Sequence, residues 1–478
     1  MRKTLLAVVI SGILIALLLA LAAWWGSPRL ESVWPPDNAG GVPVGASLRL
    51  TFSRPMQVES VVQRLTIEPV MQGAYAWQGD SLVFIPSSPW PSGETIQVKL
   101  AAGARTAGGL SFTLRQEKTW SFTIGMPRLA YLFPNDNQAD IYVLDPLTVE
   151  SQRWTNSPGG VQDFDVAADG AAMYYSVRSG QGSSAIYRLD LAHDETSTAA
   201  FQESQPTPIL IIECPRASCQ SVAISPRGDY LAYERTAFLG GEEPSYPRIW
   251  LLPLTGQDQQ DSNPQPVLAG DALHQTLGPA WSSAGILAFY DSNAAAFVIL
   301  DPYSGDTTSF PNLTGQPGAW HPNGRDFVAP EINFLDEGAS EDLTELQALA
   351  NSHLIIFNRQ DGTTRDLTQF EELEDMAPVF SPDGAYLAIA RKNLQIERWT
   401  PGRQLWLMRT GVWQAEPLTD EALYSHFEFA WSPRGDLLAY VRFNQTVLTE
   451  PPELWVIDPF TARAAQLVVG GYAPQWIP

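Results

Sequence analysis

The stretch "FSPDGAYLAIA" (380–390) decides the fold, because its pattern recurs along most of the chain. It places a large apolar residue before Ser-Pro-Asp-Gly, whose residue types favour a tight turn, and a short apolar run follows the turn. Each copy therefore predicts a strand–turn–strand unit. Five further copies of the turn are "VAADG" (166–170), "ISPRG" (224–228), "WSSAG" (281–285), "WHPNG" (320–324) and "WSPRG" (431–435).

A second block follows each of these turns and is rich in β-branched and aromatic residues, as in "LWLMR" (405–409) and "LWVID" (454–458). A fourth short run follows this block, as in "TRDLT" (364–368). Units of four short strands, repeated every 39 to 60 residues, are typical of the blades of a β-propeller.

The two ends of the repeat region are incomplete and complement each other. The segment "YAPQWIP" (472–478) repeats only the beginning of the unit, and the first unit starts at "LAYLF" (129–133) without that beginning. We therefore expect the C-terminal segment to be the inner strand of blade one, which closes the ring and removes exposed sheet edges. The prediction is seven blades, or six if the copy at 161–176 is not a blade.

The repeats "FSPDGAYLAIA" and "WSPRGDLLAYV", followed by "LWLM" and "LWVID", resemble TolB-like (WD-type) β-propeller repeats over residues 129–478. The resemblance implies interaction and scaffolding work at the cell envelope. Related propellers also occur in prolyl oligopeptidase-type enzymes, so the resemblance is specific for fold and not for function.

Residues 33–125 have a different pattern, with strand-like runs such as "LRLTF" (48–52), "SLVFI" (81–85), "TIQVKL" (95–100) and "TWSFTI" (119–124). Several short strands in fewer than a hundred residues predict a small β-sandwich. The segment resembles bacterial Ig-like domains of the type found in surface-layer proteins. It is expected to be either a stalk or a domain that binds wall polymer or a neighbouring protein. The predicted fold class is therefore all-β.

The N-terminal residues 1–26 contain Arg2 and Lys3, followed by an uncharged apolar stretch from Thr4 to Trp25. That length and charge pattern predicts a membrane anchor with the bulk of the chain outside the cytoplasm. The alternative is a cleaved signal peptide, which would make the protein secreted. The net charge of −23 argues against a nucleic-acid partner, and also against docking of the protein body on anionic lipid.

The sequence contains no H-E-x-x-H, P-loop or G-x-S-x-G motif. The prediction is a protein that is not an enzyme and uses no cofactor or metal. Cys214 and Cys219, in "ECPRASCQ", are expected to form a disulfide in an oxidising compartment. Two alternatives stay open: a propeller enzyme acting on glycans as a lyase or hydrolase through acidic residues, and an accessory or sensor subunit of a separate catalytic chain.

An insertion, "EINFLDEGASEDLTELQALANSH" (331–353), interrupts blade five between its second and third strands. Ser340 can cap a short helix in which Leu343, Leu346 and Leu349 lie on one side. Such a helix would either cover its own blade or bind a partner.

One face of the propeller is expected to carry the long loops between second and third strands together with the connections between blades. Long loops on a rigid scaffold often carry binding residues. The partner is predicted to be a protein or a cell-wall component with a basic or neutral surface, bound by a monomeric ectodomain. The candidate binding residues are Glu242, Glu243, Tyr246, Trp399, Glu371, Glu372 and Glu374.

Overall fold

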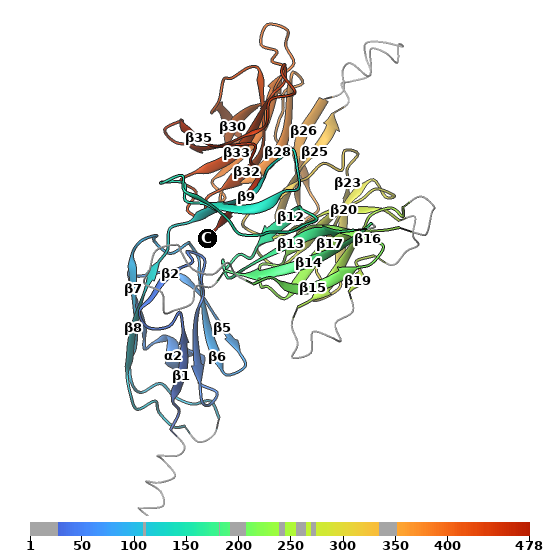
Figure 1. The fold of residues 1–478 in the computed structure, drawn as a ribbon. Helices are drawn as coiled ribbons and strands as arrows, with labels where there is room; N and C mark the ends of the chain where they lie inside the picture. Colours follow the sequence, from blue (N-terminus) through green and yellow to red (C-terminus); the bar gives the residue numbers. More distant parts are fainter. Residues whose placement is uncertain are drawn as a thin grey trace, which may run out of the picture. The chain divides into compact units, whose positions relative to one another are not determined.

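The computed structural model describes residues 27–108, 111–180, 182–191, 207–238, 244–254, 264–268, 274–333 and 351–478. The chain divides into two compact units, with the boundary between Met126 and Pro127 (Figure 1). No helix in these described ranges is long and apolar enough to cross a membrane, and the predicted anchor from Thr4 to Trp25 lies outside them.

The first unit is a sandwich of two four-stranded sheets and contains one short helix, α2 (Val58–Val62). The first sheet has the order β1 (Leu30–Trp34), β3 (Leu48–Phe52), β6 (Ser81–Pro86), β5 (Gly73–Gln78). The second has the order β2 (Ala39–Val42), β8 (Lys118–Ile124), β7 (Thr95–Leu100), β4 (Leu65–Glu68). The four strands predicted from alternation are β3, β6, β7 and β8.

The core of this unit follows from the alternation of apolar and polar residues along its strands. On β8 the side chains of Trp120, Phe122 and Ile124 are buried, as the sequence pattern predicts. Trp90 is also buried, and its indole Nε1 donates a hydrogen bond to the Ala46 carbonyl at 2.7 Å. Strands β1, β2, β4 and β5 were not predicted, because they are short or lack a clean alternation.

The described residues of the second unit form seven four-stranded sheets, which confirms seven blades rather than six. Blade one contains β36 (Tyr472–Ile477), β9 (Arg128–Phe133), β10 (Asp140–Leu144) and β11 (Ser151–Arg153). Blade two contains β12 (Val161–Val166), β13 (Ala172–Ser179), β14 (Ser183–Asp190) and β15 (Ile209–Cys214). Blade three contains β16 (Ala217–Ile224), β17 (Tyr230–Ala237), β18 (Arg248–Pro253) and β19 (Gln265–Pro266).

The remaining blades follow the same order from the inner strand outward. Blade four contains β20 (Thr276–Trp281), β21 (Leu287–Asp291), β22 (Ala296–Leu300) and β23 (Thr307–Pro311). Blade five contains β24 (Ala319–Trp320), β25 (Asp326–Asn333), β26 (Asn351–Asn358) and β27 (Thr364–Asp366). Blade six contains β28 (Leu373–Phe380), β29 (Tyr386–Asn393), β30 (Gln404–Arg409) and β31 (Gln414–Pro417), and blade seven contains β32 (Tyr424–Trp431), β33 (Leu438–Asn444), β34 (Glu453–Asp458) and β35 (Arg463–Val469).

The C-terminal strand closes the ring as predicted. β36 pairs antiparallel with β9, so that Trp476 lies opposite Leu129 and Ile477 opposite Arg128. The inner strand of every blade contacts the inner strand of the next, and β36 contacts those of blades two and seven. The repeated turn also has the predicted form, since its fifth residue is a glycine with positive φ, such as 72° at Gly384.

Repeated tryptophans link four of the blades to the blade before them. The indole Nε1 of each donates a hydrogen bond of 2.9–3.1 Å to a backbone carbonyl on the preceding inner strand. These donor–acceptor pairs are Trp281–Ala223, Trp320–Ala280, Trp431–Val379 and Trp476–Ala430. The aromatic position of the repeat therefore joins neighbouring blades as well as packing within one.

Other side chains make this link where the repeat has no tryptophan. Between blades two and three, Asp163 accepts a hydrogen bond from the Val222 amide and Asp165 accepts one from the Ile224 amide, both at 2.8 Å. Between blades one and two, Gln475 bonds to the backbone of blade two at Phe164 and Val166. Between blades five and six, the imidazole of His321 contacts the Gly384 carbonyl at 3.2 Å.

The predicted insertion in blade five is shorter than expected. Its first residues belong to β25 and its last belong to β26, which pair with each other from Asp326–Asn358 to Asn333–Asn351. The predicted helix with Leu343, Leu346 and Leu349 lies outside the described residues. In blades two and three the structure joins Cys214, at the end of β15, to Cys219 on β16 by a disulfide.

Candidate binding surface

The long-loop face, formed by the second-to-third strand loops and the connections between blades, carries a group of neighbouring segments in blades five to seven. The amide of Leu394 donates to the Glu372 carbonyl at 2.8 Å, and the amide of Gln445 donates to the Leu423 carbonyl at 2.8 Å. Gly402 also donates to the Ala422 carbonyl at 3.4 Å. Segments 370–374, 394–403, 420–424 and 445–451 therefore lie side by side.

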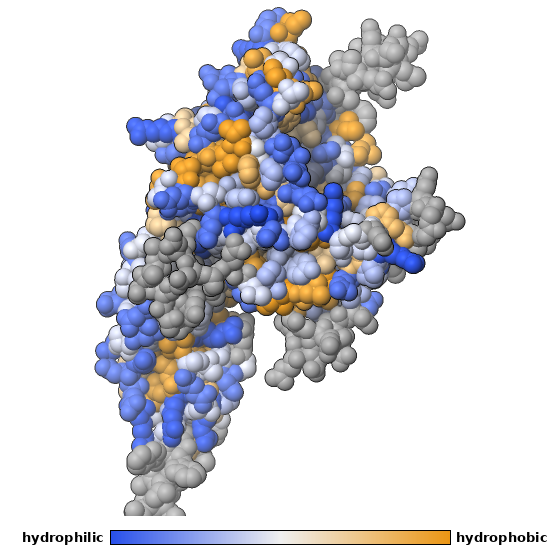
Figure 2. Space-filling view, viewed as in Figure 1, coloured by the Kyte–Doolittle hydropathy of each residue, from blue (hydrophilic) through white to orange (hydrophobic). Residues whose placement is uncertain are grey.

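These segments expose apolar side chains, which we call the apolar rim. Its members are Phe370, Leu394, Ile396, Trp399, Leu423, Val447 and Leu448. Ile396 is 87% exposed and Leu448 is 78% exposed. Figure 2 shows apolar side chains reaching the propeller surface in separate patches between hydrophilic ones. A group of exposed apolar residues on adjacent loops is a common feature of protein–protein interfaces.

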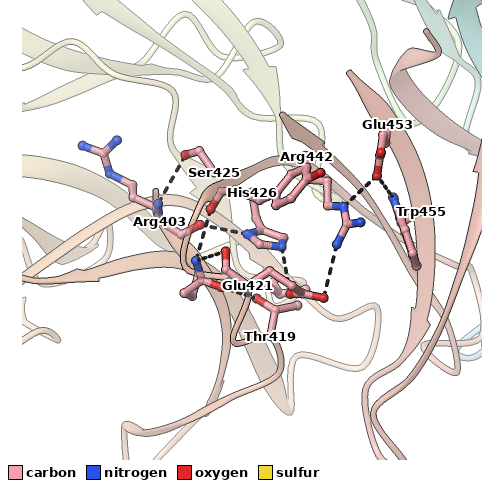
Figure 3. A network of polar contacts seen from close by, with 11 residues as sticks. Arg403, Thr419, Glu421, Ser425, His426, Arg442, Glu453 and Trp455 are labelled. Atoms are coloured by element: carbon pink, nitrogen blue, oxygen red, sulfur yellow. Dashed lines mark hydrogen bonds and ion pairs between the residues drawn. The ribbon is translucent and has the colours of Figure 1, made fainter. Parts of the chain in front are cut away.

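A buried polar network lies under the rim in blade seven (Figure 3). Arg442, which is 9% exposed, donates from Nε to Glu453 at 2.8 Å and from Nη1 to Glu421 at 3.2 Å. Its guanidinium carbon lies 4.0 Å from the ring centre of Trp455 and 4.3 Å from that of Tyr424. Arg442 thus fixes β33, β34 and the connection between blades six and seven at once.

His426 completes this network from β32. Its Nδ1 contacts the Arg403 carbonyl at 2.9 Å, and its Nε2 lies 3.7 Å from a carboxylate oxygen of Glu421. The contact with His426, supported by the charge of Arg442, lowers the pKa of Glu421 to about 2. Glu421 is therefore ionised at neutral pH and holds the loop beside Leu423 against the blade.

Blade six has an equivalent buried pair. Asp375 is fully buried and accepts two hydrogen bonds of 2.7 Å from Arg391, and Thr368 donates a third at 2.8 Å. The neighbouring Glu374 forms an ion pair with Arg403. These contacts join the connection from blade five to blade six to β28, and join β28 to β29 and to the end of the loop that carries Trp399.

The structure brings together four of the candidate binding residues and separates a fifth. Trp399, Glu371, Glu372 and Glu374 lie on the adjacent segments of blades five and six. The indole of Trp399 is 52% exposed, with Lys392 Nζ 4.7 Å from its ring centre. Tyr246, also 52% exposed, belongs to blade three. Glu242 and Glu243 lie outside the described residues.

Sequence reasoning missed most of the apolar rim and the network below it. One signal was present: an arginine on the second strand stacks on a tryptophan of the third strand in blades three, six and seven. The pairs are Arg235–Trp250, Arg391–Trp406 and Arg442–Trp455, at 4.0–5.2 Å. The tryptophan follows the arginine by 15, 15 and 13 residues, a regular spacing that marks these positions as part of the repeat.

A second candidate region is the inner end of blades two and three. Asp165 borders a cavity of about 450 Å³, together with Gln475, Trp281 and Pro226. Burial, opposed by hydrogen bonds from the Ile224 and Val166 amides and increased by the nearby Asp163, raises the pKa of Asp165 to about 7. Burial also raises the pKa of Asp163. Both carboxylates are bound to backbone amides of blade three, so their observed role is to join blades.

The described ranges contain no group of three or more His, Cys, Asp or Glu side chains arranged to hold a metal ion.

Two family models match the chain. Residues 26–124 match the bacterial Ig-like domain, and residues 344–451 match the dipeptidyl peptidase IV N-terminal region. The N-terminal unit is thus similar to a bacterial Ig-like domain, and the second unit is a β-propeller of which residues 344–451 are similar to the dipeptidyl peptidase IV N-terminal region.

Several solved structures are similar in fold at low identity. TolB from Acinetobacter baumannii is 11% identical, with a TM-score of 0.42 over 95% of this chain and 99% of that one. Oligogalacturonate lyase from Vibrio parahaemolyticus is 13% identical, with a TM-score of 0.41 over 64% and 73% of the two chains. The β-propeller domain of a Pyrococcus furiosus protease is 12% identical, with a TM-score of 0.44 over 65% and 84%. No curated protein matches the chain.

Proposed function

We propose that this chain is a non-enzymatic, membrane-anchored binding protein that works outside the cytoplasm, and that its propeller binds a partner protein through the apolar rim. The observation that carries the proposal is the exposure of Ile396, Trp399 and Leu448 on two loops that are both hydrogen-bonded to the connection at 420–424. Burial of such side chains against a partner removes apolar surface from water, which is the main driving force of association.

The charges around the rim indicate the kind of partner surface that fits. Glu371, Glu372 and Glu397 lie on the same segments as Phe370 and Ile396. Complementary charge speeds association and excludes acidic partners. The partner surface is therefore expected to combine apolar contact residues with basic or neutral ones.

The location outside the cytoplasm is supported by two features. The disulfide between Cys214 and Cys219 suits an oxidising compartment. The uncharged stretch from Thr4 to Trp25 after Arg2 and Lys3 suits an anchor whose start stays in the cytoplasm.

Photo-crosslinking in cells tests the binding surface. A photo-reactive amino acid at Ile396 or Leu448 is expected to give a discrete adduct with one partner protein. Val412 provides a matched control, because it is an apolar residue of blade six that is 65% exposed on the opposite face, in the turn between β30 and β31. An adduct at Val412 with none at Ile396 and Leu448 would place the binding surface on the opposite face of the propeller and contradict the proposal.

A further inference from the structure

The net negative charge of the chain comes from the propeller. Residues 127–478 contain 19 Lys and Arg residues against 45 Asp and Glu residues, whereas residues 27–126 contain eight against seven. The net charge of the whole chain therefore gives no information about the Ig-like domain. Repulsion from anionic lipid is therefore expected of the propeller alone.

The basic residues of the Ig-like domain gather at one end of the sandwich, which we call the Ser27 end. Strand β1 begins there, and β3 ends there because Leu30 pairs with Phe52. Strand β8 also begins there, beside the end of β7 and the start of β4, because Leu100 pairs with both Lys118 and Leu65.

Hydrogen bonds between the connecting segments show that the strand ends of both sheets meet at the same end of the sandwich. Arg115 Nε donates to Ser27 Oγ at 2.9 Å, and the Arg29 amide donates to Ser53 Oγ at 2.9 Å. The Ala107 amide donates to the Pro55 carbonyl at 2.9 Å. The segments around residues 27–29, 53–55, 99–107 and 115–118 therefore share the same surface.

Seven of the eight basic residues of the domain lie at the Ser27 end, and all except the half-buried Arg64 are exposed. They are Arg29, Arg54, Arg64, Lys99, Arg105, Arg115 and Lys118. Four acidic residues lie at the same end: Glu31, Glu59, Asp80 and Glu117, of which Glu117 pairs with Lys99 at 3.2 Å. The end is thus net positive, in contrast to the rest of the protein. Figure 2 shows hydrophilic side chains covering the part of the domain where β1 begins.

The sequence ties this end closely to the predicted anchor. Trp25 is the last residue of the apolar stretch, and only Gly26 separates it from Ser27. Because a fully extended chain spans about 3.5 Å per residue, Ser27 must lie within roughly 7 Å of Trp25. An anchor that ends at the membrane interface would therefore hold the Ser27 end at the level of the lipid headgroups.

A cavity of about 440 Å³ lies beside Ser27, between the start of β1 and the segment before β8. Arg29, Arg115 and Lys118 line it, together with the acidic Glu31 and Glu117. The three cationic side chains therefore outnumber the two acidic ones along this recess.

We propose that the Ser27 end binds the anionic phospholipid headgroups of the membrane that holds the anchor, and so fixes the domain on the membrane surface. The attraction acts over about 8 Å at physiological salt, a range that the short tether satisfies. The proposal rests on the predicted anchor and is independent of the partner-binding rim.

The test uses the full chain reconstituted in vesicles of phosphatidylcholine, with or without phosphatidylglycerol. A fluorophore attached at Gln116→Cys, between Arg115 and Lys118, reports its distance from spin-labelled lipid headgroups by quenching. Quenching is expected to increase with phosphatidylglycerol and to fall again when salt is raised. The variant Arg29→Gln/Arg115→Gln/Lys118→Gln should lose this increase.

The matched control Arg398→Gln/Arg409→Gln/Arg463→Gln removes the same charge from the propeller and should keep the increase. Equal thermal melting of the two triple variants shows that both are folded. Equal quenching in both vesicle types would overturn the proposal. This holds even if the protein binds a soluble polyglycerol phosphate, because that result would show affinity for phosphate groups and not for the lipid surface. Failure of the wild-type chain to float with phosphatidylcholine vesicles would also overturn it, since the tether would then be missing.

Discussion

Two adjacent carboxylates on β28, Glu374 and Asp375, differ in how deeply their arginine partners are buried. The sequence alone does not show this difference. Asp375 is fully buried against Arg391, while Glu374 faces Arg403, whose side chain is 33% exposed. Asp375→Ala leaves a buried guanidinium without its partner and should lower the free energy of unfolding by about 3–5 kcal/mol. Glu374→Ala should cost roughly 0–1 kcal/mol. Chemical denaturation of both variants measures the difference, and equal losses would contradict the assignment.

Asp165 gives the propeller a pH-dependent stability. Because its pKa rises from 3.8 in a free side chain to about 7 in the folded protein, folding favours the protonated form. Its contribution to stability is therefore complete below pH 4 and is lost as the pH rises through 7, by an amount on the order of a few kcal/mol.

Asp165→Asn keeps an oxygen that can accept the Ile224 amide and removes this titration. The variant should gain stability relative to the wild type as the pH rises from 4 to 8. Thermal melting at several pH values measures this gain. Parallel melting curves across that range would show that Asp165 does not titrate there.

At the scale of the element, the closing strand β36 combines a backbone ladder with one indole hydrogen bond. Trp476→Phe keeps most of the packing, as Phe380 does at the same repeat position in blade six, and removes the bond to the Ala430 carbonyl. It should therefore lower the free energy of unfolding by about 1 kcal/mol. Trp399→Phe, on an exposed loop, is the control and should have no effect.

Deletion of residues 471–478 removes the whole strand and leaves β9 and the inner strands of blades two and seven without their neighbour. We expect aggregation or a much larger fall in melting temperature than Trp476→Phe causes. If the truncated chain has the same melting temperature as the Trp476→Phe variant, β36 contributes only the indole hydrogen bond to stability.

The repeat predicted the blades and their closure because each blade reuses one local pattern of apolar residues and turn glycines. It did not predict the links between blades, since a backbone carbonyl such as that of Ala223 or Ala430 has no sequence signature as an acceptor. The candidate site was predicted in part, because long loops with Trp399 were visible. Ile396 and Leu448 were missed because an apolar residue in a loop is as consistent with packing as with binding.

At the scale of the whole molecule, the chain separates an acidic propeller from a nearly neutral Ig-like domain. The acidic propeller should attract a basic partner over long range, and this attraction weakens with ionic strength. The association rate of the partner, once identified, should therefore fall as salt is raised, whereas the dissociation rate, set by the apolar rim, should change little. Surface plasmon resonance at several salt concentrations separates the two rates.

The two exposed aromatic candidates, Trp399 and Tyr246, lie in different blades. Substitutions at both positions therefore test how much of the ring the partner covers. Trp399 belongs to the rim of blade six, and Tyr246 lies in blade three of a seven-bladed ring. Trp399→Ala should weaken partner binding by about 2 kcal/mol, as expected for an aromatic residue at an interface, without changing the melting temperature. Tyr246→Ala should have the same effect only if the partner spans the long-loop face from blade three to blade six. If Trp399→Ala binds as tightly as the wild type, the partner does not contact the rim, and the exposed apolar side chains of blades five to seven serve another purpose.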